Sequence, residues 1–307
     1  MNLATKNMPT KPRSLILLHR LRRLLIAAAD FTLPQYCVTC RNPVAAGDHM
    51  APGRWLADRS HPDGLFAAWP FAICQWCRAA LPGVKTGVKT GANQHRCPVC
   101  GLPGSHRQIC HFCREQPPAF SATVVLADYA PPLNHWIHHF KYRQRVDLGR
   151  AFGQLLAAQL LDSLPTPAWP ESIVAIALSP ARMRHRGYNQ AIVLARDLSK
   201  RLKIKADFTA LHLAGNPVAL DGKSTQTRRS RADRLSSLAG RFSATQAVAG
   251  KRVLLVDDVM TTGATARAAA GALIQAGATR VTNAVIARTP SAAWTSAPDE
   301  SIHTVSQ

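Results

Sequence analysis

The sequence predicts an α/β protein in which a doubly wound parallel sheet follows an N-terminal cysteine-rich module. Short apolar runs alternate with helical patterns between residues 122 and 287. This alternation is typical of a parallel sheet that carries helices on both faces. All eight cysteines lie before that region, in four C-x-x-C pairs. With 307 residues, 47% of them hydrophobic, the chain is long enough to bury an α/β core beside a smaller module.

The first expected element is a basic segment near the N-terminus. Residues 15–29, LILLHRLRRLLIAAA, are rich in leucine, but His19, Arg20, Arg22 and Arg23 divide the apolar run into pieces too short for a signal sequence. We therefore expect an amphipathic helix in a cytoplasmic chain, without stable membrane insertion. Attachment to a membrane surface is the alternative.

The cysteine pairs come next along the chain. Each pair can close a tight turn that presents two thiolates to one tetrahedral ion, so four pairs predict two structural Cys₄ zinc sites. A disulfide scaffold requires an oxidising compartment and thioredoxin-like pairs require a βαβ context, and neither fits this sequence. We expect the first two pairs to share one Zn²⁺ and the last two the other, with an interleaved pairing as the alternative. The pairs are Cys37/Cys40, Cys74/Cys77, Cys97/Cys100 and Cys110/Cys113.

The elements of the expected sheet domain follow in a strand and helix alternation. Strands are expected at residues 122–128, 172–178, 252–256 and 280–287. Helices are expected near 132–140 and at 148–163, 189–202 and 265–276.

The third of these strands leads into an acidic pair and a threonine-rich turn, in the stretch RVLLVDDVMTTGAT at residues 252–265. Asp257 and Asp258 would lie at the C-terminal edge of the sheet, where open α/β sheets bind ligands. The turn supplies free N–H groups at a helix N-terminus, and the hydroxyls of Thr261, Thr262 and Thr265 also suit a phosphate dianion. Carboxylates repel phosphate and instead match sugar hydroxyls or a hydrated Mg²⁺. The stretch therefore predicts a site for a phosphorylated sugar.

Two basic segments are expected around the same crevice. The stretch SPARMRHRGYNQ, residues 179–190, follows the second strand, and its arginines Arg182, Arg184 and Arg186 suit a pyrophosphate. Residues 215–234 are polar, basic and without periodicity, so they form a candidate lid over the site. The alternative for both segments is a solvated set of charges.

The stretch VLLVDDVMTTGAT resembles the phosphoribosyl-pyrophosphate (PRPP) signature of type I phosphoribosyltransferases. The resemblance implies that Asp257 and Asp258 contact the ribose 2′- and 3′-hydroxyls as the catalytic pair, and that Mg²⁺ accompanies PRPP. It also implies a PRPP-binding loop over the 5′-phosphate. That loop comprises Val259, Met260, Thr261, Thr262, Gly263, Ala264 and Thr265.

The chain as a whole, from about residue 24 to residue 287, resembles the competence-protein-F (ComF) family. In that family a double zinc ribbon precedes a phosphoribosyltransferase-like domain. The supporting passages are HWIHHFKYRQR at 135–145, SPARMRHRGYNQAIVLA at 179–195, and Gln226 with SRADR at 230–234. Ser237 departs from the family, whose members often have Asn there. By this resemblance Pro180, Arg182, Arg186 and Gln226 join the PRPP site.

The resemblance also sets the expected domain boundaries. We expect a type I phosphoribosyltransferase-like sheet behind the double zinc-ribbon module. The boundaries are 1–30 for the basic amphipathic segment, 31–118 for the zinc-ribbon module, 119–288 for the phosphoribosyltransferase-like domain and 289–307 for a flexible tail.

Three functions follow from the resemblance and compete. The first is transfer of ribose 5-phosphate from PRPP to an unidentified acceptor, with release of pyrophosphate. The second is PRPP sensing without catalysis. The third is docking of single-stranded DNA or competence proteins during DNA uptake. Thr261 stands where salvage enzymes for 6-oxopurines carry Asp, which disfavours hypoxanthine and guanine as acceptors. Glutamine amidotransfer is disfavoured because every cysteine belongs to a C-x-x-C pair.

The charge of the chain supports anionic partners in general. Its 38 Lys and Arg exceed its 17 Asp and Glu by 21, and two Cys₄ zinc sites at about −2 each would leave about +17. A field of this size favours association with phosphates, including those of nucleic acids. General solubility is the alternative use of this charge.

Overall fold

The structure is a computed structural model, and it describes residues 36–43, 73–81, 95–104, 108–214 and 240–290. Three sequence predictions lie outside the described residues. They are the amphipathic segment at 15–29, the candidate lid at 215–234 with Gln226, and the tail beyond residue 290.

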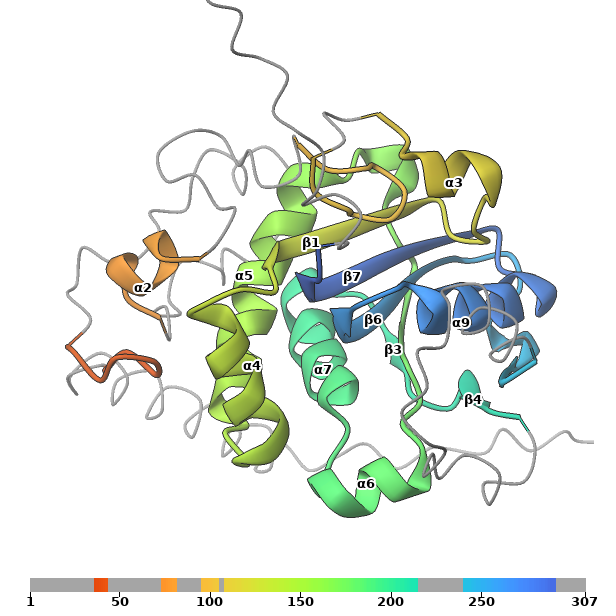
Figure 1. The fold of residues 1–307 in the computed structure, drawn as a ribbon. Coiled ribbons are helices and arrows are strands. Elements are labelled where there is room, and N and C mark those ends of the chain that lie inside the picture. The colour runs from red at the N-terminus through yellow and green to blue at the C-terminus, as the bar shows by residue number, and fades with distance from the viewer. Residues whose placement is uncertain (1–35, 44–72, 82–94, 105–107, 215–239, 291–307) are drawn as a thin grey trace, which may run out of the picture.

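A five-stranded parallel sheet forms the centre of the fold (Figure 1). Its strand order is β1-β7-β6-β2-β3, and each neighbouring pair runs parallel. The strands are β1 (Ala122–Asp128), β2 (Ser172–Ala175), β3 (Ala206–Asp207), β6 (Arg252–Met260) and β7 (Arg280–Arg288). The predicted parallel sheet is therefore confirmed.

Helices cover both faces of the sheet (Figure 1). On β6, Leu254 and Val256 join one buried cluster with the helices α4, α5 and α7, whereas Val253 and Leu255 join another with α9. Alternate residues of a strand point to opposite faces, so this apolar run supplies both layers of the core. The helices are α4 (Leu133–Tyr142), α5 (Asp147–Ser163), α7 (Gln190–Leu202) and α9 (Ala264–Gln275).

Residues 180–186 form a helix that the sequence analysis treated as a basic turn. This helix, α6 (Pro180–Arg186), begins with Ser179, whose Oγ accepts the Arg182 N–H at 3.4 Å, and it has Pro at its first position. It ends at Gly187, which has a left-handed φ of 78°. Capping serine, N-terminal proline and C-terminal glycine are ordinary helix boundaries.

The structure also contains short elements that the sequence analysis did not predict. The antiparallel strands β4 (Leu211–Leu213) and β5 (Phe242–Ala244) form a hairpin, and the Ala214 N–H donates to the Arg241 carbonyl at 2.9 Å. Residues 214 and 241, between which the candidate lid falls in the sequence, are therefore held side by side. Single-turn helices lie at η4 (Thr166–Ala168) and η6 (Gln246–Val248).

The cysteine-rich part of the chain packs directly on the sheet domain. Its short helices are α2 (Gln75–Ala79) and α3 (His111–Glu115). Cys37 and Cys74 are buried with Ala151 of α5, whereas the last four cysteines are buried with Val125 of β1. Within the described ranges, no helix is both long enough and apolar enough to cross a membrane.

Candidate functional site

The eight cysteines form two clusters of four. The first cysteine cluster is Cys37, Cys40, Cys74 and Cys77, and the second is Cys97, Cys100, Cys110 and Cys113. In each cluster the Sγ atoms lie within 4.8 Å of one another, with Cys40 and Cys74 at 3.7 Å and Cys100 and Cys110 at 3.6 Å. A tetrahedral Zn²⁺ with Zn–S bonds of about 2.3 Å places its sulfurs about 3.8 Å apart. Both clusters could therefore hold zinc, and the cysteines group as predicted rather than interleaved.

The two clusters are built as repeats of one unit. In each unit the first C-x-x-C pair lies in a turn closed by a β-bridge, Tyr36 with Pro43 or Arg96 with Pro103. The second pair begins a short helix, and its first N–H donates to the first Sγ of the unit at 3.3 Å or 3.4 Å. The residue after the second cysteine has a left-handed φ in both units, 64° at Arg41 and 67° at Gly101.

Burial and hydrogen bonding strongly perturb the pKa values of thiols in the first cysteine cluster. Burial and the neighbouring sulfurs raise the pKa of Cys77 to about 12. Burial also opposes ionisation of Cys37, but N–H groups, including those of Cys40 and Cys74, and the Thr39 hydroxyl outweigh it and lower its pKa to about 6. Four such thiols lose their protons together only when a cation compensates their charge, which is what Zn²⁺ supplies.

The predicted sugar-phosphate site lies where β6 runs past the end of β2. The last pair between these strands is Ala175 with Val256, but β6 continues beside β7 as far as Met260. The strand is thus longer than the predicted 252–256. Because β2 stops earlier, Asp257 and Asp258 have no strand neighbour on that side within the described sheet.

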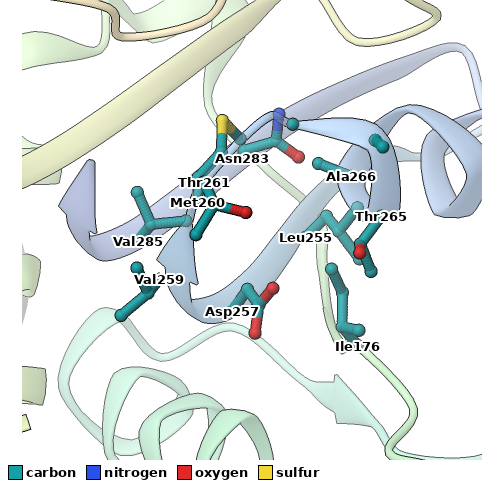
Figure 2. A pocket seen from close by; sticks show the side chains of 12 residues that line it. Ile176, Leu255, Asp257, Val259, Met260, Thr261, Thr265, Ala266, Asn283 and Val285 are labelled. Carbon is teal, nitrogen blue, oxygen red and sulfur yellow. The ribbon is translucent and has the colours of Figure 1, made fainter. Parts of the chain in front are cut away.

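Asp257 lines a pocket beside the threonine-rich loop (Figure 2). It faces the same opening as Thr261 and Thr265, with Asn283 of β7 on the pocket wall. Six predicted loop residues line this pocket, namely Val259, Met260, Thr261, Gly263, Ala264 and Thr265.

The loop ends at the N-terminus of α9. Gly263 is the N-cap, with a left-handed φ of 82°, a conformation that glycine adopts without steric cost. The Thr262 hydroxyl accepts the Ala264 N–H at 3.3 Å, and Thr262 is not among the residues that line the pocket. The remaining N–H groups of the first turn suit an anion.

Asp258 lies on the opposite face of β6 and is buried, with 7% of its surface exposed. Its carboxylate pairs with the Lys141 Nζ of α4 at 3.0 Å and with the Arg186 Nη1 of α6 at 3.6 Å. Adjacent residues of a strand point to opposite sides, which explains why the two carboxylates separate. Contact of both with one ribose stays a prediction.

Lys141 is the site residue that the sequence reasoning did not assign. It lies in the stretch HWIHHFKYRQR, and its position in the last turn of α4 brings it to Asp258. The amphipathic pattern of that stretch predicts a helix, but it does not indicate which carboxylate the lysine meets.

The predicted basic residues of α6 differ in exposure: Arg186 is half-buried, whereas Arg182 and Arg184 are exposed. Arg186 donates to the Gln190 Oε1 at 3.0 Å, and its guanidinium lies 5.3 Å from the centre of the Tyr142 ring. Arg182, Arg184 and Pro180 are exposed on α6. Arg186 is thus fixed beside Asp258, whereas the exposed side chains are accessible to a ligand.

The two carboxylates also differ in electrostatic surroundings. Burial and the charge of Asp258 raise the pKa of Asp257 to about 7. The Asp258 N–H, which donates to the Asp257 Oδ1 at 2.8 Å, opposes this rise, as do the charges of Lys141 and Arg186. Asp257 therefore titrates near neutral pH in the ligand-free protein.

Comparison with known proteins places this chain in a family. Residues 189–300 match the model of the phosphoribosyl transferase domain. The chain is 31% identical over 253 residues to the DNA utilization protein YhgH of Escherichia coli K12, which covers 81% of this chain and 95% of the relative. It is 33% identical over 205 residues to competence protein F of Haemophilus influenzae, covering 62% and 86%. Competence protein ComFC of Bacillus subtilis is 26% identical over 211 residues, covering 67% and 79%.

Solved structures with similar folds include two phosphoribosyl enzymes. The glutamine PRPP amidotransferase of B. subtilis, solved with ADP and GMP, is 21% identical, with a TM-score of 0.32 over 48% of this chain and 30% of that chain. The purine phosphoribosyltransferase of Pyrococcus horikoshii is 20% identical, with a TM-score of 0.28 over 51% and 79%. The identity and coverage of the curated relatives decide the assignment: this chain belongs to the competence protein F (ComF) family, together with the DNA utilization protein YhgH.

Proposed function

We propose that this chain binds PRPP with Mg²⁺ and transfers its ribose 5-phosphate to an acceptor, releasing pyrophosphate. The observation that carries the proposal is the pocket in which Asp257 faces the threonine loop and the N-terminus of α9. A carboxylate beside a phosphate cradle matches a ligand that has hydroxyls close to a phosphate.

Each part of the pocket has a role in this reaction. The loop from Thr261 to Thr265 would hold the 5′-phosphate, and Asp257 would accept hydrogen bonds from the ribose. Arg182, exposed on α6, would contact the pyrophosphate. The bond from C1 of the ribose to pyrophosphate breaks, a bond from C1 to the acceptor forms, and the acceptor proton leaves to solvent. Mg²⁺ prefers phosphate oxygens and water, and when bound with PRPP it would neutralise pyrophosphate charge.

We also propose a structural role for the two cysteine clusters. Each would hold one structural Zn²⁺, so purified protein should contain about two zinc ions per chain. These ions would support folding and would not touch the sugar-phosphate pocket.

Calorimetric titration with PRPP and Mg²⁺ tests the proposal. We expect binding by the wild type and a loss of affinity of about ten- to a hundredfold in Asp257→Asn, because hydrogen bonds to a charged group are lost. Glu171→Gln is the matched control. Glu171 pairs with Arg252 at the first residue of β6, at the end of the strand opposite to Asp257. A wild type that does not bind PRPP would remove both the transferase and the sensor.

A second measurement separates transferase from sensor. Pyrophosphate release is followed while candidate nucleobases and other nucleophiles are added to the PRPP complex. Release that depends on an acceptor identifies a transferase, whereas tight PRPP binding without release identifies a sensor.

Affinity for PRPP should depend on pH through Asp257. Its pKa is raised to about 7, so it is largely protonated at about pH 6 and largely ionised at about pH 8. The ionised form is the better hydrogen-bond acceptor for ribose, and affinity should therefore rise across this range. The slope should be smaller in Asp257→Asn, which lacks this ionisable carboxyl group. Equal slopes in the two proteins would contradict this role for Asp257.

We also propose that the exposed face shared by α4 and α6 binds single-stranded nucleic acid. Tyr142 is 43% exposed, and its ring lies 4.9 Å from that of His138 and 5.9 Å from that of His185, measured between centroids. Exposed rings among cationic groups are the usual platform for stacking bases. The names of the relatives, which refer to DNA utilization and competence, agree with this partner.

Fluorescence anisotropy of a labelled oligonucleotide tests the stacking face. We expect Tyr142→Ala to weaken binding about tenfold, as loss of one stacked base implies. Phe208→Ala is the matched control, because Phe208 is also exposed and also lies under an arginine, Arg196. Absence of binding at low salt, or binding that does not weaken as salt rises, would refute a phosphate-dependent partner.

A further inference from the structure

Arg288, the last residue of β7, connects the second cysteine cluster with the phosphate loop. The phosphate loop is the threonine-rich loop at residues 261–265 that follows β6. Arg288 is only 1% exposed, and among the residues that the structure describes it is the largest fully buried side chain. Its Nε donates to the carbonyl of Cys100 at 3.0 Å, and its Nη1 donates to the carbonyls of Met260, at 3.1 Å, and Thr261. One guanidinium therefore holds a zinc-ligand residue and the start of the phosphate loop at once.

The loop depends on this contact because of how β6 ends. Met260 pairs with Arg288 across the sheet, and β2 ended four residues earlier, at Val256 on β6. The Met260 carbonyl also accepts the Thr289 N–H at 3.0 Å, whereas the Thr261 carbonyl lies beyond the last paired residue of β6. A guanidinium presents several N–H donors in a fixed plane, so it can hold these carbonyls in one arrangement.

The second cysteine cluster is in turn fixed to the sheet. The Thr123 hydroxyl of β1 donates to the Val99 carbonyl at 2.6 Å, between the first two cysteines of the cluster. Arg96, 3% exposed, pairs with the Asp128 carboxylate at 2.7 Å. The position of the Cys100 carbonyl is therefore set by the folded turn of this cluster, which zinc would hold closed.

The first cysteine cluster has a different attachment. The Arg145 Nη2 donates to the Val38 carbonyl at 2.7 Å, and Cys37 and Cys74 pack on Ala151 of α5. This cluster lies on the side of the α5 helix, so it serves as an internal comparison for the second.

We propose that Arg288 is a positioning residue that couples the zinc-bound shape of the second cysteine cluster to the conformation of the phosphate loop. Loss of zinc from that cluster would release the Cys100 carbonyl, and the loop would lose part of its fixed geometry. The consequence for PRPP affinity rests on the proposed function, whereas the coupling itself is measurable without any ligand.

Amide hydrogen exchange of the loop, read by mass spectrometry in ligand-free protein, tests the coupling. We expect Arg288→Lys to accelerate exchange at Thr261–Thr265 about three- to tenfold, as the loss of one net hydrogen bond implies, while α5 is unchanged. Arg280→Lys is the matched control, because Arg280 begins the same strand and donates to the Ser121 hydroxyl at 2.8 Å. Unchanged loop exchange in Arg288→Lys would overturn the proposal.

A mutant cycle separates coupling from a purely structural role. Cys113→Ser, which empties the second cluster, should accelerate loop exchange in the wild-type background and add little in Arg288→Lys. Cys77→Ser, which empties the first cluster, should leave loop exchange unchanged. Additive effects of Cys113→Ser and Arg288→Lys, or an equal effect of Cys77→Ser, would overturn the coupling.

Two further readouts keep the outcome decisive. If Arg288→Lys does not fold, the comparison of Cys113→Ser with Cys77→Ser still decides between a specific and a general effect of zinc loss. PRPP titration of the same variants is independent of exchange. Failure of the wild type to bind PRPP would refute the proposed function and leave the coupling intact.

Discussion

Replacement of Lys141 by methionine should lower the free energy of unfolding by about 3 kcal/mol. The side chains of Lys141 and Asp258 are 15% and 10% exposed, and their charged atoms are 3.0 Å apart. Breaking such a pair leaves a buried carboxylate with incomplete compensation. The expected cost lies at the low end of the range for buried pairs because Arg186 stays 3.6 Å from the other Asp258 oxygen.

Urea unfolding of the zinc-loaded protein measures this effect. Asp258→Asn in the Lys141→Met background should restore most of the lost stability, because it removes the buried charge. Lys251→Met is the control, since Lys251 is exposed and its Nζ donates to the Ala247 carbonyl at 2.7 Å, near the start of β6. That change should stay within about 0.5 kcal/mol.

The double variant, Lys141→Met with Asp258→Asn, distinguishes two causes of a lower stability in Lys141→Met: loss of charge pairing and loss of packing. If the double variant is less stable than Lys141→Met alone, the lysine acts through packing of its aliphatic stem rather than through the charge of Asp258. The ion pair also has a functional consequence, because Lys141 and Arg186 hold the strand end on which Asp257 is presented. Lys141→Met should therefore weaken PRPP binding even where the protein stays folded.

The long strands of the sheet could be predicted from the sequence because each contains a run of buried apolar residues. The runs at 122–128 and 280–287 match β1 and β7 to within one residue. The strands β3, β4 and β5 have two or three residues each, which is too few to show a period of two. Their position depends on pairing with distant segments.

The end of β6 shows why the site itself was less predictable than its sheet. Two adjacent aspartates are poor strand formers, and local preference therefore ends the strand at Val256. Pairing with β7 instead extends it to Met260, so tertiary contacts outweigh that preference. The same extension turns Asp258 away from the pocket and toward Lys141, a relation that no local pattern encodes.

Cysteine spacing was more informative because zinc geometry constrains it. The four C-x-x-C pairs predict two tetrahedral sites, and the observed clusters have the expected grouping. The role of Arg288 was not predictable, since a basic residue at the end of a strand usually lies in solvent. Its burial arises only when the second cysteine cluster packs on β1 and β7.

Replacement of Gly101 by arginine should lower the free energy of unfolding by about 2–4 kcal/mol, whereas Arg41→Gly should be tolerated. The two residues occupy the same position of the repeated cysteine unit, each with a left-handed φ. At Gly101 an added Cβ would lie 2.5 Å from the Val125 Cγ2, a fully buried and branched side chain that cannot move aside. Arg41 is exposed and already carries its side chain in that conformation.

Thermal unfolding and zinc analysis of both variants measure this difference. Gly101→Arg should unfold at lower temperature and retain about one zinc ion per chain, because its second cysteine cluster is displaced from β1. Arg41→Gly should retain about two. If the left-handed backbone alone set the cost, Arg41→Gly would gain about as much stability as Gly101→Arg loses, because glycine adopts that conformation without steric cost. A loss in Gly101→Arg well above the gain in Arg41→Gly would instead identify close packing on β1 as the reason why the second unit requires glycine where the first accepts arginine.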